Sequence, residues 1–231
     1  MRLGVFLLLL LPVFVGLNSC SDSSDYVSKN PNAAFFYPLD SVPRIYLYRD
    51  VSGGLEEEFH RIYTVKDQAG PHLIVEIYAS DGRIKEAYNY NIDSLNLQDY
   101  MVVDVNQEKE KALLYKNQLF PMSLNENTWF AAKFKGIVDS TVMLSEVKRH
   151  LKRKEKHVVM DDEEPTLVFS DLLRLTVLNP FTRKEEAKQT TRISYFANGF
   201  GLVEWHNLNK TAHFRLEQVL TQQEWIKMIT R

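Results

Sequence analysis

The sequence predicts a mainly β protein: one large antiparallel sheet, a sandwich or a half-open barrel, with a short C-terminal helix. Apolar and polar residues alternate along most segments, which is the period of a strand with one buried face. Turn signals recur about every 8–12 residues, a spacing typical of antiparallel sheet proteins. The chain also carries 13 Phe and 11 Tyr, residue types that favour strands.

The first half of the chain shows the clearest strand patterns. Pro43–Val51 and Glu58–Asp67 each read as one strand. His72–Ile92 reads as two strands joined at Asp81-Gly82, because Asp-Gly is a preferred pair for a tight type I′ hairpin turn. We therefore expect at least three consecutive antiparallel strands here.

The middle of the chain is less uniform. Asp99–Pro121 predicts two strands around a charged turn at Asn106–Lys111, and Asn127–Gly136 alternates as a further strand. Ser140–Met160 fits two structures, since Leu144, Val147 and Leu151 recur at helical spacing but β-branched residues begin the segment. A strand is favoured at its start, and its middle stays open between strand and helix.

Strands also dominate the C-terminal part, with about ten expected in the whole chain. Pro165–Phe181 is apolar, and Arg192–Leu220 reads as three strands with a bend at Gly199 and Gly201. That glycine pair indicates a bulge or a close approach of another backbone segment.

The chain closes on a predicted helix. Thr221 can cap it with Glu224 at its third position, a capping box. Trp225, Met228 and Ile229 then share one helical face.

The N-terminus has the layout of a secretory signal peptide. Arg2 precedes an apolar run from Leu3 to Leu17, which small and polar residues follow. The run is shorter than the roughly 20 residues that a spanning helix needs, and Pro12 interrupts it. A permanent transmembrane anchor is the alternative.

The end of this run carries the only cysteine in the chain. Leu17-Asn18-Ser19-Cys20 resembles the lipobox of bacterial lipoproteins, with Asn18 at a position where Ala, Ser, Thr or Val is commoner. The resemblance implies that Cys20 is diacylated and becomes the new N-terminus. Each CH₂ group of the lipid chains that is buried in the membrane would contribute about 0.8 kcal/mol to anchoring. A free thiol and a discarded signal residue are the alternatives.

The lipobox divides the chain into three parts. Residues 1–19 are the signal peptide, residues 20–34 are the lipidated cysteine and a flexible Ser-, Asp- and Asn-rich tether, and residues 35–231 are one β-rich domain. Ser21 after the cysteine resembles the outer-membrane sorting signal of proteobacterial lipoproteins. Asp22 and Asp25 partly resemble the surface-export signal of Bacteroidota. We therefore expect an outer-membrane lipoprotein, on the periplasmic face or at the cell surface.

The net charge of the mature chain gives no sign of a nucleic-acid partner. Loss of Arg2 with the signal leaves 27 Lys and Arg against 30 Asp and Glu, a net charge of −3. This near balance gives no reason to expect nucleic acid as a partner. The membrane, through the lipid, and an envelope protein are the expected partners.

Histidine supplies the one weak sign of a metal site. His206 and His213 flank a predicted hairpin, and Glu204 lies two residues before His206 on the same face. Zinc requires three or four ligands, so ordinary sheet-surface histidines are the favoured interpretation, and no metal or cofactor is expected. Lys148–His157 is strongly basic and could contact lipid phosphates, but Asp161–Glu164 follows directly, which favours a solvated hairpin.

No catalytic motif is present. The segments containing Ser170 and Asp171 lack a Gly-x-Ser-x-Gly elbow, and no phosphate-binding glycine loop occurs. Asn209-Lys210-Thr211 is a glycosylation sequon without a routine role in a bacterial lipoprotein, and Asp99 and Asp104 lack the spacing of a glycosidase pair.

The segment Tyr195–Trp205, "YFANGFGLVEW", resembles the closing hairpin of envelope β-sheet proteins with a LolA-like or related curved sheet. This implies binding of an apolar ligand on the concave face. From the whole sequence we expect a non-enzymatic, membrane-tethered binding or assembly component. Carriage of a lipid or other apolar ligand is the alternative, and an envelope hydrolase is a third.

Overall fold

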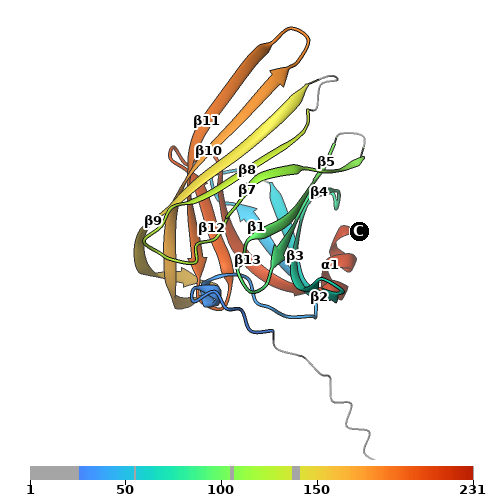
Figure 1. Cartoon of the computed structure of the whole chain (residues 1–231). Helices are drawn as coiled ribbons and strands as arrows, with labels where there is room; N and C mark the ends of the chain where they lie inside the picture. Colours follow the sequence, from blue (N-terminus) through green and yellow to red (C-terminus); the bar gives the residue numbers. More distant parts are fainter. Residues whose placement is uncertain (1–25, 55, 105–106, 137–140, 231) are drawn as a thin grey trace, which may run out of the picture.

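One open, strongly curved sheet makes up most of the molecule (Figure 1). The computed structural model describes residues 26–54, 56–104, 107–136 and 141–230. These residues form a 13-stranded antiparallel sheet in the order β6-β5-β4-β3-β2-β1-β13-β12-β11-β10-β9-β8-β7. First and last strands meet in its middle, where β1 pairs with β13, and the sheet is not closed. The predicted fold class is confirmed as a single curved sheet with a short C-terminal helix, not a sandwich.

The strands follow the predicted pattern closely in most places. They are β1 (Arg44–Asp50), β2 (Glu57–Asp67), β3 (Gly70–Ala79), β4 (Ile84–Asn91), β5 (Leu97–Val103), β6 (Lys109–Lys111), β7 (Leu113–Asn117), β8 (Thr128–Lys135), β9 (Val142–Val159), β10 (Asp162–Asn179), β11 (Lys184–Ala197), β12 (Gly201–Asn207) and β13 (His213–Thr221). More strands form than the ten expected, because Asp99–Pro121 yields three strands. Lys109–Lys111, which belonged to the predicted turn at Asn106–Lys111, forms β6 instead, and residue 106 lies outside the described residues.

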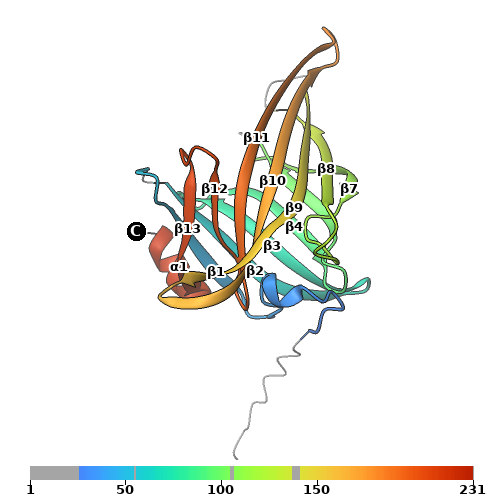
Figure 2. The same ribbon diagram turned by 90° about the vertical axis from the view of Figure 1, so that its left-hand side faces the viewer.

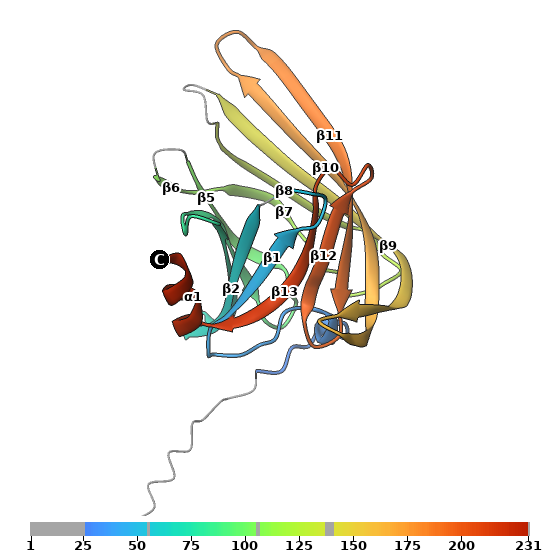
Figure 3. The same ribbon diagram turned by 180° about the vertical axis from the view of Figure 1, so that it is seen from behind.

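From Val142 to Val159 the ambiguous segment is a strand. This strand, β9, runs for 18 residues and pairs with β10 along nearly its whole length and with β8 over its first half. The helical reading is wrong, because β10 supplies backbone hydrogen-bond partners along the strand. β10 and β11 project beyond the rest of the sheet as a long hairpin, seen from the side in Figure 2 and from behind in Figure 3.

The turn predicted at Asp81-Gly82 has a different type, and two successive positive φ angles occur at another hairpin turn. Between β3 and β4, Gly82 has a φ of +77°, but Asp81 does not have a positive φ, so the turn is not type I′. Its backbone bonds instead join Ala79 to Gly82 and Arg83. Positive φ angles at two successive residues occur at Met160 (+48°) and Asp161 (+87°), between β9 and β10. Long-range pairing there imposes a conformation that the residue types do not favour.

The core lies on the concave face of the sheet. Aromatic rings from distant strands meet there, with Phe36 in contact with Tyr90, Phe120 and Phe196 at ring-centroid distances of 5.1, 4.8 and 6.4 Å. The largest cluster of buried apolar side chains extends from β1 to β13 around this centre. Curvature of the sheet is therefore maintained by packing across its own interior.

Part of the predicted tether belongs to the packed body. The 3₁₀ helix η1 (Ala33–Phe35) and the residues before it lie against the end of the sheet opposite the β10–β11 tip (Figure 1). Asn30 and Asn32 are buried, and their side-chain amides donate to the carbonyl of Pro121 over 3.3 and 3.1 Å. Composition alone suggested disorder here, because short polar side chains bury little area. They order the segment by hydrogen bonding instead.

The predicted close approach at the glycine pair is confirmed. Gly201 has a φ of +83°, and a Cβ built there would lie 2.8 Å from the backbone nitrogen of Tyr37. The amide of Gly199 donates to the carbonyl of Ala34 over 2.8 Å. The turn between β11 and β12 therefore holds the N-terminal segment at the base of the sheet.

Helix α1 (Gln222–Ile229) covers a small cluster on the outer face, which includes Phe59 and Trp225. The predicted capping box is present, with reciprocal bonds between Thr221 and Glu224. Trp225 is buried and Ile229 packs on the cluster, but Met228 is exposed. The predicted apolar face is thus narrower than expected. Among the described residues, no helix has the length and apolarity required to cross a membrane.

Substitution of Thr221 by alanine should lower the free energy of unfolding by about 1 kcal/mol. The hydroxyl accepts from the amide of Glu224, one of the free amides in the first turn of α1, which would remain without a partner. Urea unfolding followed by circular dichroism measures this change. Replacement by serine retains the cap and serves as the control. A loss of stability equal in the two variants would show that the cap bond contributes nothing.

Candidate functional site

A partly open pocket of about 370 Å³ lies on the concave face of the sheet. The N-terminal segment, strands β2, β3 and β4, and strands β8 to β12 contribute side chains to it. Its aromatic side chains include Tyr37, Tyr88, Tyr90, Phe130, Phe196 and Trp205. This size and lining are typical of small-molecule binding sites.

One wall of the pocket contains a buried ion cluster from β9, β10 and β11. Asp171 has no exposed surface, and its two oxygens accept from Nε and Nη2 of Arg149 over 2.7 and 2.9 Å. The hydroxyl of Ser194 and Nη2 of Arg192 also donate to Asp171, over 2.7 and 3.3 Å. The third nitrogen of Arg149 donates to the carbonyl of Leu119 over 2.6 Å. Both oxygens of Asp171 and all three side-chain nitrogens of Arg149 therefore have a hydrogen-bond partner.

These partners keep the central carboxylate ionised. Burial alone raises the pKa of Asp171, but the charge and hydrogen bonds of Arg149, together with Arg192 and Ser194, outweigh burial and lower the pKa to about 2. The guanidinium of Arg149 also lies over the rings of Phe169 and Phe196, at 5.2 and 4.8 Å. The buried pair of Arg149 and Asp171 thus holds Arg192 in position through the bond from Arg192 to Asp171.

The wall formed by β2, β3 and β4 carries the acidic groups. Glu58 accepts from Nε2 of His60 over 2.9 Å and from Lys85 over 2.8 Å. Burial raises its pKa, but His60 and Lys85 outweigh burial and hold the pKa at about 2. The hydroxyl of Tyr37 lies 3.0 Å from Nδ1 of His60. Glu86 accepts from the hydroxyl of Tyr100 over 2.6 Å.

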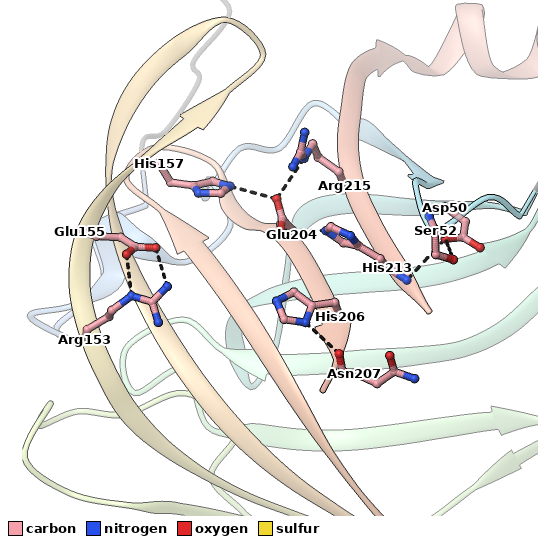
Figure 4. A network of polar contacts seen from close by, with 10 residues as sticks. All are labelled: Asp50, Ser52, Arg153, Glu155, His157, Glu204, His206, Asn207, His213 and Arg215. Atoms are coloured by element: carbon pink, nitrogen blue, oxygen red, sulfur yellow. Dashed lines mark hydrogen bonds and ion pairs between the residues drawn. The ribbon is translucent and has the colours of Figure 1, made fainter. Parts of the chain in front are cut away.

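A second buried carboxylate lies away from the pocket (Figure 4). Glu204 on β12 accepts from Nε2 of His157, Nε2 of His213 and Nε of Arg215 over 3.0, 2.9 and 3.0 Å. Burial raises its pKa, but hydrogen bonds from His157 and His213 and the charge of Arg215 hold it at about 2. This Glu204 cluster fastens the curled end of β9 to β12 and β13.

The sequence correctly placed His206 and His213 side by side. They are direct partners across β12 and β13, with ring centroids 5.2 Å apart. His206 directs Nδ1 to the carbonyl of Asn207 over 2.9 Å, whereas His213 contacts Glu204. Within the described part of the chain, no group of three His, Cys, Asp or Glu side chains could hold a metal ion. The sequence pattern did not include His157, which approaches from β9.

Stability should fall on acidification as the Glu204 cluster is neutralised. The folded pKa of Glu204 is about 2, below its ordinary value of 4.5. The cluster therefore contributes fully above about pH 4.5, and this contribution is lost as the pH falls toward 2. Glu204→Gln should cost about 2 kcal/mol at pH 7 and flatten the decline between pH 4.5 and 2. Urea midpoints across this range measure both effects. An unchanged pH profile would exclude Glu204 as its source.

A larger groove of about 490 Å³ lies on the outer face of the long strands. Trp129, Leu144 and Leu178 contribute apolar surface, and Arg174 and Glu185 form its charged part. Trp129 is 39% exposed and Leu178 is also 39% exposed. The concave pocket is the better candidate because its charged groups are buried or half-buried, are positioned by hydrogen bonds and are surrounded by aromatic rings.

The other residues singled out by sequence lie apart from the pocket, with one exception. Cys20 lies outside the described residues. In the basic run on β9, Lys148, Lys152 and Lys156 are exposed, whereas Arg149 is buried and belongs to the pocket wall. Asp99 forms an ion pair with Lys111. Asn209 is exposed in the turn between β12 and β13.

Comparison with known proteins gives similarity of fold only. No family model and no curated protein matches the sequence. A chain from Parabacteroides distasonis, described as a "putative lipoprotein", is 10% identical with a TM-score of 0.48, over 80% of this chain and 98% of that one. A "putative exported protein with YmcC-like fold" from Bacteroides fragilis is 12% identical with a TM-score of 0.42, over 81% and 99%.

Proposed function

We propose that this chain is an outer-membrane lipoprotein that acts as a non-catalytic, membrane-tethered binding component, with its ligand in the concave pocket. The observation that carries this proposal is the pocket itself: about 370 Å³, lined by aromatic side chains and by charged groups held in place by hydrogen bonds. Pre-positioned polar groups reduce the ordering cost of binding.

The state of the carboxylates supports binding over catalysis. A general acid or base works best with a pKa near the operating pH. The pKa values of Glu58 and Asp171 are instead lowered to about 2 by paired cations. Both groups remain ionised and engaged at neutral pH. They suit a binding wall better than proton transfer.

The tether sets where the binding takes place. Diacylation of Cys20 would hold the domain at the membrane, and the ordered chain enters the domain at the end opposite the β10–β11 tip (Figure 1). Confinement at the membrane surface raises the effective concentration of the domain toward envelope partners. The tip, with exposed Phe181, would then point away from the membrane.

Transport of a wholly apolar ligand is the second candidate, favoured by the aromatic lining. The pocket also contains Glu58, Glu86 and Arg192. A ligand without polar groups would displace water from these charged side chains and offer no hydrogen bonds in its place, which costs free energy. The charged walls therefore favour a ligand with both polar and apolar parts.

The intact mass of protein purified from membranes tests the anchor. We expect a chain that begins at Cys20 and carries a diacylglyceryl addition, and we expect Cys20→Ser to lose that addition. An unmodified wild-type chain would contradict the tether.

Filling the pocket tests the binding site. Ser145 is a small residue that lines it, so Ser145→Trp should block the pocket without removing core atoms. In the unlipidated Cys20→Ser protein, the neutral fluorophore N-phenyl-1-naphthylamine should bind, and Ser145→Trp should weaken binding about 10-fold or more. Equal binding by both proteins would place the fluorophore elsewhere and overturn the pocket assignment.

A further inference from the structure

We propose that the concave pocket selects an amphipathic anion: a ligand with an aromatic or aliphatic body and one sulfonate, carboxylate or phosphate group, which Arg192 binds. This inference rests on the proposed binding function of the pocket and adds the chemical class of its ligand. It depends on three features: the unused donors of Arg192, the charge of its wall and the arrangement of the facing wall.

Arg192 is positioned but not saturated. Its Nη2 donates to Asp171 over 3.3 Å, a long bond, and its guanidinium lies 5.8 Å from the ring centre of Trp205. Its Nε is buried without a hydrogen-bond partner. Arginine carries five N–H donors in a fixed plane. Because Nε is buried and one Nη2 hydrogen is directed to Asp171, the two hydrogens of Nη1 and the second of Nη2 are left for a ligand. Its side chain keeps 29% of its surface exposed, in the pocket wall.

The wall around Arg192 has an excess of positive charge. Asp171 supplies one negative charge, and Arg149 and Arg192 supply two positive ones. Arg149 already makes two short bonds to Asp171 and one to Leu119. The uncompensated charge therefore resides on Arg192. In a partly dehydrated pocket, an anionic group paired with a guanidinium forms strong hydrogen bonds.

The facing wall gives the ligand a direction. Glu86 lies in that wall, and Glu58 is paired there with Lys85 and hydrogen-bonded to His60. Burial raises the pKa of Tyr90, and the charges of Arg149, Glu86 and Arg192 also act on it, so Tyr90 lies within reach of both walls. An anion would be repelled by Glu86 and attracted by Arg192. The ligand body would lie on the ring surfaces of Tyr88 and Tyr90, whose centroids are 6.1 Å apart.

Two fluorophores that differ only in a charged group test the proposal. 8-Anilinonaphthalene-1-sulfonate carries a sulfonate, and N-phenyl-1-naphthylamine has the same rings without it. Titrations use the unlipidated Cys20→Ser protein, with near-ultraviolet circular dichroism to confirm native packing. We expect Arg192→Met to weaken sulfonate binding at least 10-fold, equivalent to about 1.4 kcal/mol, and to leave the neutral fluorophore within about 2-fold.

Arg174→Met is the matched control. Arg174 lies on the neighbouring strand β10, but it belongs to the outer groove, so its loss should change neither affinity. Glu86→Gln provides a second test that leaves Arg192 in place. Removal of the facing carboxylate should tighten sulfonate binding several-fold without an effect on the neutral fluorophore.

The outcomes separate the ligand class from the pocket itself. If Ser145→Trp blocks both fluorophores but Arg192→Met and Glu86→Gln affect them equally, the anion preference is wrong and the pocket function stands. If Ser145→Trp blocks neither fluorophore, the pocket function fails as well. If Arg192→Met loses native packing, an unchanged sulfonate affinity in Glu86→Gln overturns the proposal.

Discussion

Replacement of Asp171 by alanine is expected to lower the free energy of unfolding by about 3–5 kcal/mol. The substitution leaves Arg149 buried, at 5% exposure, without the carboxylate that accepts two of its hydrogen bonds. It also removes the acceptor of Ser194 and Arg192. Urea unfolding at neutral pH measures the loss.

Two comparisons distinguish this effect from simple loss of an ion pair. Arg174→Ala removes an exposed pair with Glu185, 3.7 Å long, and should cost about 0–1 kcal/mol. The double variant Arg149→Met with Asp171→Leu removes both buried charges, so it should be more stable than Asp171→Ala. A double variant that is less stable than the single one would contradict the explanation by an unpaired buried charge.

Replacement of Gly201 by alanine is expected to cost about 2–5 kcal/mol. A positive φ of +83° strains any residue with a Cβ, at about 1–2 kcal/mol. The added Cβ would also lie 2.8 Å from the nitrogen of Tyr37 and 3.0 Å from the carbonyl carbon of Phe36. Backbone atoms cannot rotate away, so a shift of this segment adds about 1–3 kcal/mol. Urea unfolding again measures the effect.

Gly199→Ala separates the two costs. Gly199 has a similar φ of +77°, but a Cβ there would meet nothing within 4 Å. It should therefore show the conformational strain alone, about 1–2 kcal/mol. Because Phe36 and Tyr37 line the pocket, Gly201→Ala should also weaken binding of the neutral fluorophore, whereas Gly199→Ala should not. Equal effects of the two variants would show that the close approach of the N-terminal segment is unimportant.

The strands could be predicted because most of them have one apolar and one polar face. β2 and β3 show this alternation over much of their length, whereas β1 is buried on both faces because its outer face packs in the cluster under α1. β9 could not be predicted in this way, because its second half carries charged residues on both faces. Its conformation depends on pairing with β10 along the strand and with β8 along its first half. The conformation of the N-terminal segment depends on Asn30 and Asn32, whose acceptor at Pro121 is about 90 residues away.

The pocket could not be predicted for a related reason. Arg149, Asp171 and Arg192 lie 21–22 residues apart and come together only through the pairing of β9, β10 and β11. The local signal at Arg149 was its position in β9: it lies on the same face of the strand as the apolar residues Val147 and Leu151. A charged residue on the apolar face of a strand indicates a buried partner of opposite charge. The basic run around it concealed this signal by resembling a solvated face.

Position of the pocket relative to the tether connects the structure to the proposed role. The N-terminal segment carries the chain to the base of the sheet, and the same segment supplies Phe36 and Tyr37 to the pocket. In the proposed role, tethering and binding would therefore share one structural element. Loss of its docking at Gly201 should affect the pocket while leaving lipidation of Cys20 unchanged.

A crystal structure of the Cys20→Ser protein with 8-anilinonaphthalene-1-sulfonate tests the central claim, ligand binding in the concave pocket, most directly. We predict the rings of the fluorophore among Tyr88, Tyr90 and Phe130, and its sulfonate within hydrogen-bonding distance of Arg192. Fluorophore found only in the outer groove beside Trp129 and Leu144, with the concave pocket empty, would contradict both the site and its preference for an anion.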